Sequence, residues 1–393
     1  IAVVGDRRSS NTYSLYEIAQ KINPHSYLLT SNHPFKIDEN DKTVLQNSKD
    51  ISILAGTSSP YYVLDETVES LSKLLSDKTE LPPVIVIYGP TAVGKSSFAE
   101  NLAESINGEI VNYDSMQVYK HLSIGTAKPK LEGSTIPMHL FDYLDPKKRI
   151  TVASYQKKAL AKINEIHDRK SIPILVGGSY LYISSLIDGL FEMEPGSNTE
   201  EVRKMLFDET SEKGLPYMYN KLISVDIESA KKIHSNDKKR ILRALEVFQI
   251  TGQPISKLQK TKTKKPSFFS IKFGLLRKPE TIYSRIHKRT SLMMKDGLLD
   301  EVKWLSENNY SDAINEIKAH GYRELMQHVN NKISLDDALN EMEQTTRHYA
   351  KRQLSWLRQR SDFHLINLDA SPKEKINDIA KEMINVAIKY SSI

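Results

Sequence analysis

Residues 89–96 read GPTAVGKS and fit a phosphate-binding loop at every position. An apolar run, residues 84–87, precedes them, and a helix-like stretch, residues 97–103, follows. This order of strand, glycine-rich loop and helix predicts a parallel α/β sheet with an anion at the helix N-terminus. We expect Lys95 to supply a point charge and the Ser96 hydroxyl to hold Mg²⁺, while the motif leaves open which di- or triphosphate binds. The predicted diphosphate-binding residues of the loop are Gly89, Pro90, Thr91, Ala92, Val93, Gly94, Lys95 and Ser96.

The overall composition is that of a folded protein with two or three domains. Of the 393 residues, 39% are hydrophobic and 26% are charged. We expect a cytoplasmic protein, because no apolar run approaches the roughly 18 residues of a membrane span and no leader peptide stands at the start. The absence of cysteine excludes disulfides and an iron–sulfur cluster held by the chain itself. The chain opens at Ile1 inside a strand-like run, so we expect it to be cut from a longer sequence.

Basic residues are concentrated in one segment. Residues 1–80 carry 8 Lys and Arg against 11 Asp and Glu, whereas residues 231–290 carry 17 against 3. This excess favours a polyanionic partner larger than one nucleotide, although a lysine-rich surface that only keeps the protein soluble has the same composition.

Two further strands are expected to reach the same edge of the sheet as the loop. Residues 109–113 and 172–176 are apolar runs, each followed by polar residues. The first places Asp114 beside the loop, because the carboxyl ends of parallel strands meet at one edge. The second leads into two glycines, which allow close backbone approach, and then Ser179, which either caps the next helix or contacts substrate.

Beyond these strands the pattern is mainly helical. The expected elements are helices over residues 199–213, 216–225, 227–233 and 236–247, a mobile basic loop over 257–265, a strand over 268–276 and helices over 279–389. Arg240 and Arg243 share one helix face, where they either bind phosphate or form surface ion pairs. In residues 347–358 arginines alternate with Tyr349 and Trp356, which fits RNA contact or, for Trp356, the core.

Eight motifs spanning roughly residues 84–365 resemble the tRNA dimethylallyltransferase family. In chain order they are GPTAVGKS at 89–96, DSMQVY at 114–119, IGTAKP at 124–129, HL and DP between 139 and 146, GGS at 177–179, the segment from ND to R at 236–243, GYRE at 321–324 and YAKRQ at 349–353. Two positions depart from the family pattern. Its usual threonine after the paired glycines is Ser179, which keeps the hydroxyl, and its usual double histidine is Met138 with His139.

The resemblance implies a P-loop parallel sheet with an inserted helical RNA-binding domain and a helical C-terminal part, preceded by a small α/β fragment. The expected boundaries are residues 1–76 for the fragment, 77–83 for a linker, 84–195 for the catalytic core, 196–270 for the inserted domain and 271–393 for the remainder of the core with C-terminal helices.

The resemblance also implies a reaction: transfer of a dimethylallyl group from dimethylallyl diphosphate to N6 of adenosine 37 in tRNAs that read codons beginning with U. An aromatic amine is a poor nucleophile because its lone pair is delocalised, so a base must remove a proton, and Asp114 is the candidate. Ser179 would hydrogen-bond the adenine or Asp114, and the adenine would leave the anticodon-loop stack. The expected catalytic residues are Asp114, Ser179 and Lys95.

Charge grows on the diphosphate as it leaves. Lys95, the loop N–H groups and Mg²⁺ on Ser96 would stabilise that charge, and Arg240 or Arg243 would add to the stabilisation. The partners implied are dimethylallyl diphosphate and the tRNA anticodon stem-loop, bound by a monomer. The residues expected to bind tRNA are Asp114, Ser115, Met116, Gln117, Ser179, Arg203, Lys239, Arg240 and Arg243.

The first 75 residues resemble a different family. VVG at 3–5 with SSNT at 9–12, and AGTSSP at 55–60, are similar to the last third of hydroxymethylbutenyl diphosphate reductase. The resemblance implies that Ser10, Asn11 and Ser58 match diphosphate-holding residues, whereas the residues alone favour helix caps. The cysteines that ligate that family's cluster are absent, so we expect a relic or the tail of a fusion.

Two other functions remain open at this point. In a P-loop kinase of a small metabolite, the loop would hold ATP and Asp114 would accept a hydroxyl proton. That function accounts for the loop but not for the basic helical half. A non-catalytic RNA-binding module would need neither Lys95 nor Asp114.

Overall fold

The computed structural model of the chain describes residues 2–4, 10–24, 26–29, 53–55, 81–191, 199–263, 266–370, 381 and 384. The chain divides into two compact units, one of Ile1–Pro83 with Pro372–Ile393 and one of Val84–Ser371. The unit that contains the P-loop therefore ends at Ser371, whereas the sequence had suggested that it runs to residue 393.

The smaller unit contains a three-stranded parallel sheet in the order β2–β1–β3, with helix α1 against β1. Its elements are β1 (Ala2–Val4), α1 (Ser10–Ile22), β2 (Tyr27–Leu29) and β3 (Ile53–Ala55). The strand and helix expected at the start of the chain are thus present, and Ser10 and Asn11 begin α1. Ser58 and the helix expected over residues 61–75 lie outside the described residues.

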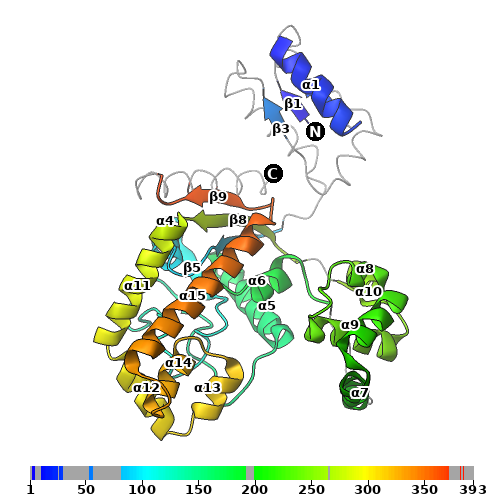
Figure 1. The fold of residues 1–393 in the computed structure, drawn as a ribbon. Coiled ribbons are helices and arrows are strands. Elements are labelled where there is room, and N and C mark those ends of the chain that lie inside the picture. The colour runs from blue at the N-terminus through cyan, green and yellow to red at the C-terminus, as the bar shows by residue number, and fades with distance from the viewer. Residues whose placement is uncertain are drawn as a thin grey trace. The chain divides into compact units, whose positions relative to one another are not determined.

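The larger unit is built on a six-stranded sheet in the order β6–β5–β7–β4–β8–β9 (Figure 1). The strands are β4 (Pro83–Tyr88), β5 (Gly108–Asn112), β6 (Met138–His139), β7 (Ile172–Val176), β8 (Phe269–Leu276) and β9 (His364–Asn367). The pairs β6–β5, β5–β7, β7–β4 and β8–β9 are parallel. The α/β class with a parallel P-loop sheet is therefore confirmed.

Helices cover both faces of this sheet. Val84, Val86 and Tyr88 alternate along β4 and share one buried cluster with residues of α5 (Val152–Asp168) and α6 (Tyr180–Ile187). The side chains that lie between these three residues along β4 point to the opposite face of the sheet. On that face α4 contacts β5 and β7.

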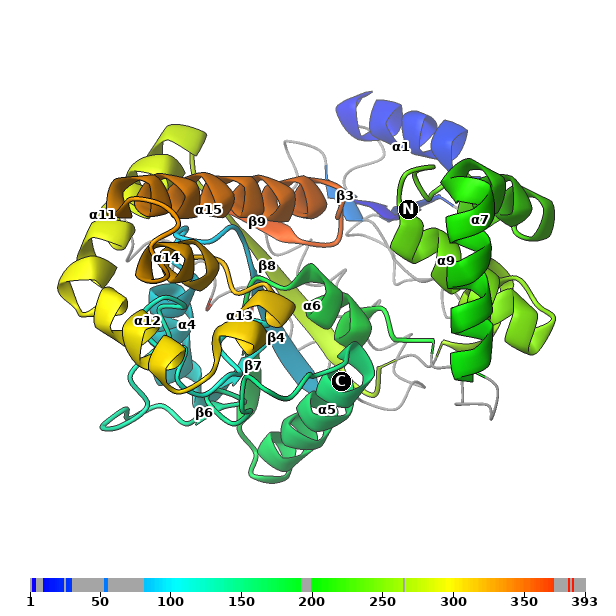
Figure 2. The same cartoon turned by 60° about the horizontal axis from the view of Figure 1, so that its bottom comes forward.

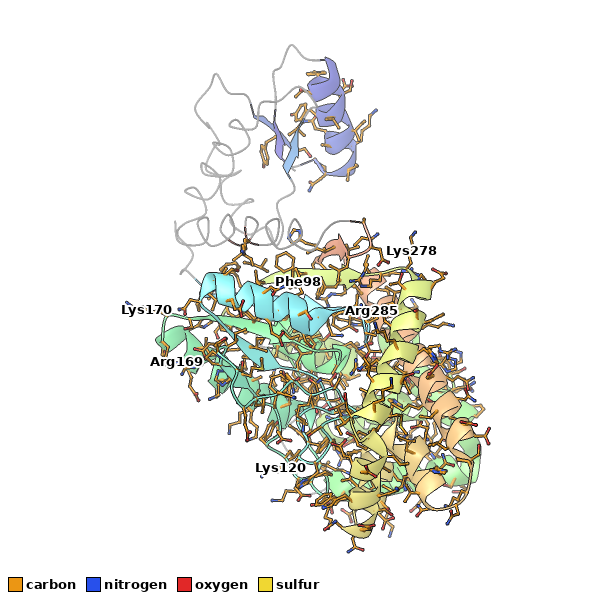
Figure 3. The ribbon with its side chains drawn as sticks, turned by 90° about the vertical axis from the view of Figure 1, so that its left-hand side faces the viewer. Phe98, Lys120, Arg169, Lys170, Lys278 and Arg285 are labelled. Atoms are coloured by element: carbon orange, nitrogen blue, oxygen red, sulfur yellow. The ribbon has the colours of Figure 1, made fainter. Side chains whose placement is uncertain are left out.

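α4 (Lys95–Ile106) begins at the end of the P-loop. Its Phe98 meets Phe273 of β8 edge to face, with ring centroids 6.1 Å apart (Figure 3). The P-loop helix is thus fixed against a strand that lies far along the chain.

Four helices form a lobe beside the sheet, as both views show (Figures 1 and 2). This helical lobe consists of α7 (Thr199–Val225), α8 (Ile227–Ala230), α9 (Lys238–Thr251) and α10 (Ile255–Lys262). It has its own buried cluster, and Gly214, with φ 81°, kinks α7 between the two helices expected there. Residues 257–262 are helical and not a loop, because Leu258 is buried and anchors α10, while Lys264 and Lys265 lie outside the described residues.

After β8 the chain is helical again. The helices are α11 (Pro279–Lys295), α12 (Leu298–Glu307), α13 (Ser311–Ile317), α14 (Tyr322–Val329) and α15 (Leu335–Arg358). On α15, Leu357 is fully buried, and the Trp356 ring packs 4.5 Å from that of Tyr88. Leu357 belongs to the core, and Trp356 is partly buried against it. Among the described helices, none has both the length and the apolar character needed to cross a bilayer.

Candidate active site

A cavity of about 1340 Å³ lies at the carboxyl ends of β4, β5 and β7. Several parts of the chain form its walls, among them the P-loop with the start of α4, the turn after β5 that carries Asp114 and Gln117, the segment of residues 123–132, and α11. This is the edge of a parallel sheet at which ligands bind. The wall residues that bear on the chemistry are Thr91, Gly94, Lys95, Ser96, Asp114, Gln117, Arg285 and Arg289.

The P-loop has the turn that its sequence predicts. Gly94 has a φ of 114°, which glycine adopts without strain, and α4 starts at the next residue. The Lys95 Nζ donates to the carbonyl oxygens of Gly89 and Pro90, each at 3.0 Å. Burial lowers the pKa of Lys95 from 10.5 to about 8, the negative charge of Asp114 opposes this shift, and Arg289 adds to it. Ser96 is exposed and lines the cavity.

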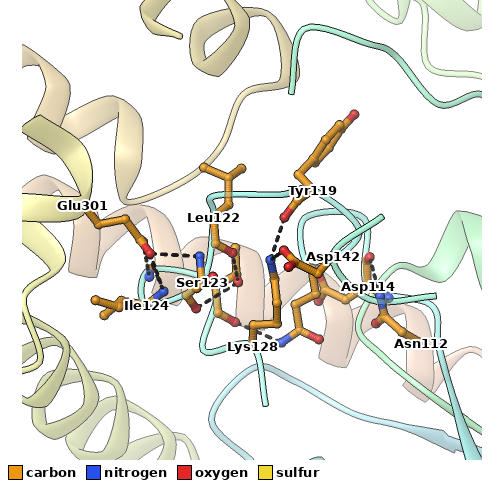
Figure 4. Close-up of polar contacts among 12 residues, drawn as sticks. Asn112, Asp114, Tyr119, Leu122, Ser123, Ile124, Lys128, Asp142 and Glu301 are labelled. Carbon is orange, nitrogen blue, oxygen red and sulfur yellow. Dashed lines mark hydrogen bonds and ion pairs between the residues drawn. The ribbon is translucent and has the colours of Figure 1, made fainter. Parts of the chain in front are cut away.

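Asp114 follows β5 and is held by its own neighbours. Its N–H donates to Asn112 Oδ1 at 2.8 Å, and its Oδ1 accepts the N–H of Met116 at 2.9 Å (Figure 4). A Cβ on Gly177 would lie 2.7 Å from the Asp114 nitrogen, and one on Gly178 would lie 3.6 Å from Oδ2. Gly177 is therefore required for the close approach of β7 to the Asp114 turn, whereas a Cβ on Gly178 would make only ordinary van der Waals contact with Asp114.

Two arginines of α11 face the P-loop, and sequence reasoning missed both. Arg289 donates to Thr91 Oγ1 at 3.3 Å and to the Thr126 carbonyl at 3.1 Å. Arg285 donates to the Ala92 carbonyl at 2.6 Å, close to the start of α4 (Figure 3). Burial lowers the pKa of Arg289, and Asp114 opposes that shift. The signal in the sequence was the four-residue spacing of the two arginines, which puts them on one helix face.

Arg240 and Arg243 do not line this cavity, which corrects the expectation that they bind the diphosphate. They lie on α9 of the helical lobe, where Arg240 pairs with Asp237 at 3.4 Å and Arg243 pairs with Glu246 at 3.0 Å. Arg203 pairs with the same glutamate at 2.8 Å. In the structure both arginines form surface ion pairs, on a helix that docks on α7.

Gln353 of α15 links the P-loop to the end of β7 by hydrogen bonds. Its Oε1 accepts the N–H of Thr91 at 2.8 Å, and its Nε2 donates to the carbonyl of Gly178 at 2.9 Å. The hydroxyl of Tyr349 donates to the same carbonyl at 3.1 Å. Gln353 is the last residue of the YAKRQ motif, but the motif did not predict that this side chain contacts the P-loop.

The remaining expected residues lie in three places: beside Asp114, at the start of α6, and on α9. Ser115, Met116 and Gln117 follow Asp114, and the Gln117 side chain donates to the carbonyls of residues 126 and 127 at 3.0 and 3.1 Å. Ser179 is the N-cap residue of α6, but its side chain makes no capping hydrogen bond, so its hydroxyl remains available. Lys239 is exposed on α9, away from the cavity walls.

Comparisons with known families identify both parts of the chain. A model described as IPP transferase matches residues 117–360, and a model described as LytB protein matches residues 1–72. The second match confirms the reductase-like resemblance of the N-terminal fragment.

Curated relatives and solved structures match most of the chain. The tRNA dimethylallyltransferase of Carboxydothermus hydrogenoformans is 42% identical over 307 residues, which are 77% of this chain and 97% of the relative. That of Caldanaerobacter subterraneus subsp. tengcongensis is 40% identical over 279 residues, 70% of this chain and 88% of the relative. The crystal structure of the tRNA isopentenylpyrophosphate transferase from Bacillus halodurans is 32% identical, with a TM-score of 0.58 over 79% of this chain and 98% of that one. A eukaryotic dimethylallyltransferase acting on tRNA is 29% identical, with a TM-score of 0.64 over 77% of this chain and 80% of that one. The chain therefore belongs to the IPP transferase family, to which the tRNA dimethylallyltransferases belong.

Proposed function

We propose that this chain transfers a dimethylallyl group from dimethylallyl diphosphate to N6 of adenosine 37, beside the anticodon, in tRNAs that read codons beginning with U. The products are N6-dimethylallyladenosine and diphosphate. The observation that carries the proposal is the position of a carboxylate, Asp114, in the wall of a cavity that also contains a complete P-loop and two arginines. The names of the relatives, which are tRNA dimethylallyltransferases, support the same substrates.

Asp114 is the proposed base. The N6 lone pair is delocalised into the adenine ring, so the nitrogen becomes nucleophilic as its proton is removed. The Oδ1 of Asp114 is already engaged by the Met116 N–H, which leaves Oδ2 to accept that proton. The bond from N6 to the allylic carbon forms while the bond from that carbon to the diphosphate oxygen breaks, and both electrons of the broken bond leave with the diphosphate.

Lys95, Arg289 and the P-loop N–H groups are proposed to hold the diphosphate. The Lys95 ammonium donates to two loop carbonyls, and the Arg289 guanidinium donates to Thr91 and Thr126. Both cations are partly desolvated, so a phosphate oxygen between them would interact more strongly than at an exposed site. The P-loop here binds a leaving group, and no phosphoryl transfer is required.

Mg²⁺ fits this site. Mg²⁺ keeps several waters and is held by substrate phosphates with one or two protein oxygens, so the exposed Ser96 hydroxyl suffices as the protein ligand. Among the described residues, no cluster of three or more His, Cys, Asp or Glu side chains could hold a metal by itself. Bound with the diphosphate, Mg²⁺ would neutralise part of the charge that grows on the leaving group.

We propose that the helical lobe binds tRNA. Arg203, Lys239, Arg240 and Arg243 present exposed or half-exposed positive charge on α7 and α9, which suits contact with the RNA backbone. We propose that Ser115, Met116, Gln117 and Ser179 contact the flipped adenosine beside Asp114. We propose that the protein acts as a monomer, in the cytoplasm where its tRNA substrate is.

Labelled dimethylallyl diphosphate and tRNA, mixed without ATP, test this function. Label should enter tRNA, and Asp114→Asn should lower the turnover rate by a factor of about 10² to 10⁴ with little change in tRNA affinity. Asp300→Asn is the matched control, because that side chain is 83% exposed on α12. Transfer at an unchanged rate by Asp114→Asn would remove this residue from the mechanism, and consumption of ATP without tRNA would support the kinase.

A further inference from the structure

A carboxylate of the C-terminal helices holds the segment that lines the cavity (Figure 4). The Glu301 side chain of α12 accepts the N–H of Ser123 at 3.1 Å, that of Ile124 at 3.1 Å to each oxygen, and that of Gly125 at 3.4 Å. Successive N–H groups that converge in this way form an anion-binding nest. Here a side chain of the same protein fills the nest.

Tyr322 completes the arrangement. Its hydroxyl donates to Glu301 Oε1 at 2.5 Å and accepts the N–H of Gly125 at 3.0 Å. Tyr322 is fully buried, and a Cβ on Gly125 would lie 2.6 Å from its ring. The contact therefore requires glycine at position 125 and leaves the segment little freedom to shift.

The other end of the segment is also fixed. The Lys128 ammonium, which is almost fully buried, donates to the carbonyl of Tyr119 at 2.6 Å and pairs with Asp142 (Figure 4). Residues 123–128 are thus anchored at both ends, and Glu301 supplies the anchor that comes from outside the P-loop sheet.

The anchored segment reaches the P-loop through one arginine. The carbonyl of Thr126, the residue after the nest, accepts from Arg289 at 3.1 Å. Another nitrogen of that guanidinium donates to Thr91 Oγ1 of the P-loop at 3.3 Å. Arg289 is consequently placed by two contacts, one on the P-loop and one on the segment that Glu301 holds.

We propose that Glu301 is a positioning residue for diphosphate binding and transfer: it fixes residues 123–127 so that the Thr126 carbonyl orients Arg289 toward the diphosphate site. Glu301 itself touches no substrate. The inference rests on the proposed function, because it assigns the diphosphate to the P-loop cavity.

Glu301→Gln is the informative substitution. The amide keeps the size of the side chain but turns an NH₂ group toward backbone N–H donors and removes the negative charge. Binding of inorganic diphosphate with Mg²⁺, measured by titration calorimetry, should weaken about tenfold, and kcat/KM for dimethylallyl diphosphate should fall by a factor of about 10 to 100, since misplacement by about 1 Å has effects of this size. The KM for tRNA should not change.

Three controls separate positioning from general stability. Asp300→Asn, on the exposed side of the same helix, should behave as the unchanged chain. Val302→Ala removes buried volume from α12 and should lower the melting temperature without a selective loss of diphosphate affinity. In an Arg289→Ala background, Glu301→Gln should have little further effect, because the arginine through which it acts is gone.

The measured diphosphate affinity tests the role of Glu301 even if the chain transfers no dimethylallyl group. Failure of the positioning proposal can therefore be distinguished from failure of the proposed transferase function. A Glu301→Gln variant that binds diphosphate as tightly as the unchanged chain overturns the inference. So does a Val302→Ala variant with the same selective loss, or a Glu301→Gln effect that adds in full to that of Arg289→Ala.

Discussion

Replacing Gln353 by leucine tests whether α15 holds the P-loop closed. The side chain is 1% exposed and makes two hydrogen bonds, one from the Thr91 N–H and one to the Gly178 carbonyl. Leucine has a similar volume, so the substitution removes the hydrogen bonds without opening a large cavity. After the substitution, one of the two former partners still has a hydrogen bond and the other does not. This difference sets the expected loss of stability.

The Gly178 carbonyl retains the Tyr349 hydroxyl at 3.1 Å, so it remains paired in Gln353→Leu. Among the described residues, no other group accepts the Thr91 N–H. A buried donor left unpaired costs about 1–3 kcal/mol, and Thr91 is only partly buried, so we expect about 1–2 kcal/mol. That corresponds to a fall of about 2–6 °C in the melting temperature of a unit of this size.

Tyr349→Phe provides the decisive comparison, measured by thermal unfolding under circular dichroism. On its own it leaves no buried group unpaired and should change stability little, because Gln353 still donates to Gly178. Together, the two substitutions deprive that buried carbonyl of both donors, so the double variant should lose about 1–3 kcal/mol more than the sum of the singles. Gln344→Leu, on the exposed face of α15, is the control. Simple additivity, or an equal loss in the control, would refute the reasoning.

Three further results are expected. Because burial lowers the pKa of Lys95 to about 8, its charge is present below that pH and absent above it, so kcat/KM for dimethylallyl diphosphate should fall as pH rises through about 8, and Lys95→Arg should remove that limb. Replacing Arg203, Lys239 and Arg240 together by alanine should reduce the slope of log tRNA affinity against log salt by about 2 to 3, and an unchanged slope would assign them to solubility. A chain cut to residues 81–371 should transfer at a rate within about twofold of the full chain, since the compact unit begins at Val84 and ends at Ser371; its inactivity would make residues 1–80 or 372–393 part of the catalytic unit.

The parts of the site that lie within a few residues of one another were predictable from the sequence. Eight consecutive residues define the P-loop, and the end of β5 determines where Asp114 stands. Arg289 and Gln353 were not predictable, because they lie 198 and 262 residues from Thr91 and reach it only through tertiary packing.

The two arginine pairs show why a local sequence pattern is insufficient to predict which residues line the cavity. Arg240 and Arg243 share one face of a helix, and so do Arg285 and Arg289. Both helices are amphipathic and basic, and helical periodicity predicts a buried face without naming what buries it. α9 packs against α7, whereas α11 supplies a wall of the P-loop cavity, so only the second pair lines that cavity. Fold class, by contrast, followed from the apolar strands and their connections, which are local.

The dependence of the P-loop on Gln353 also has a consequence for protein synthesis. At roughly 5–20 residues per second, the 262 residues between Thr91 and Gln353 take about 13–50 s to translate. For that time the nascent chain contains the full GPTAVGKS motif without the glutamine that accepts its Thr91 N–H, and for most of it without Arg289 or β8. A chain released before residue 353 would therefore carry an intact motif whose Thr91 N–H lacks the acceptor that α15 supplies.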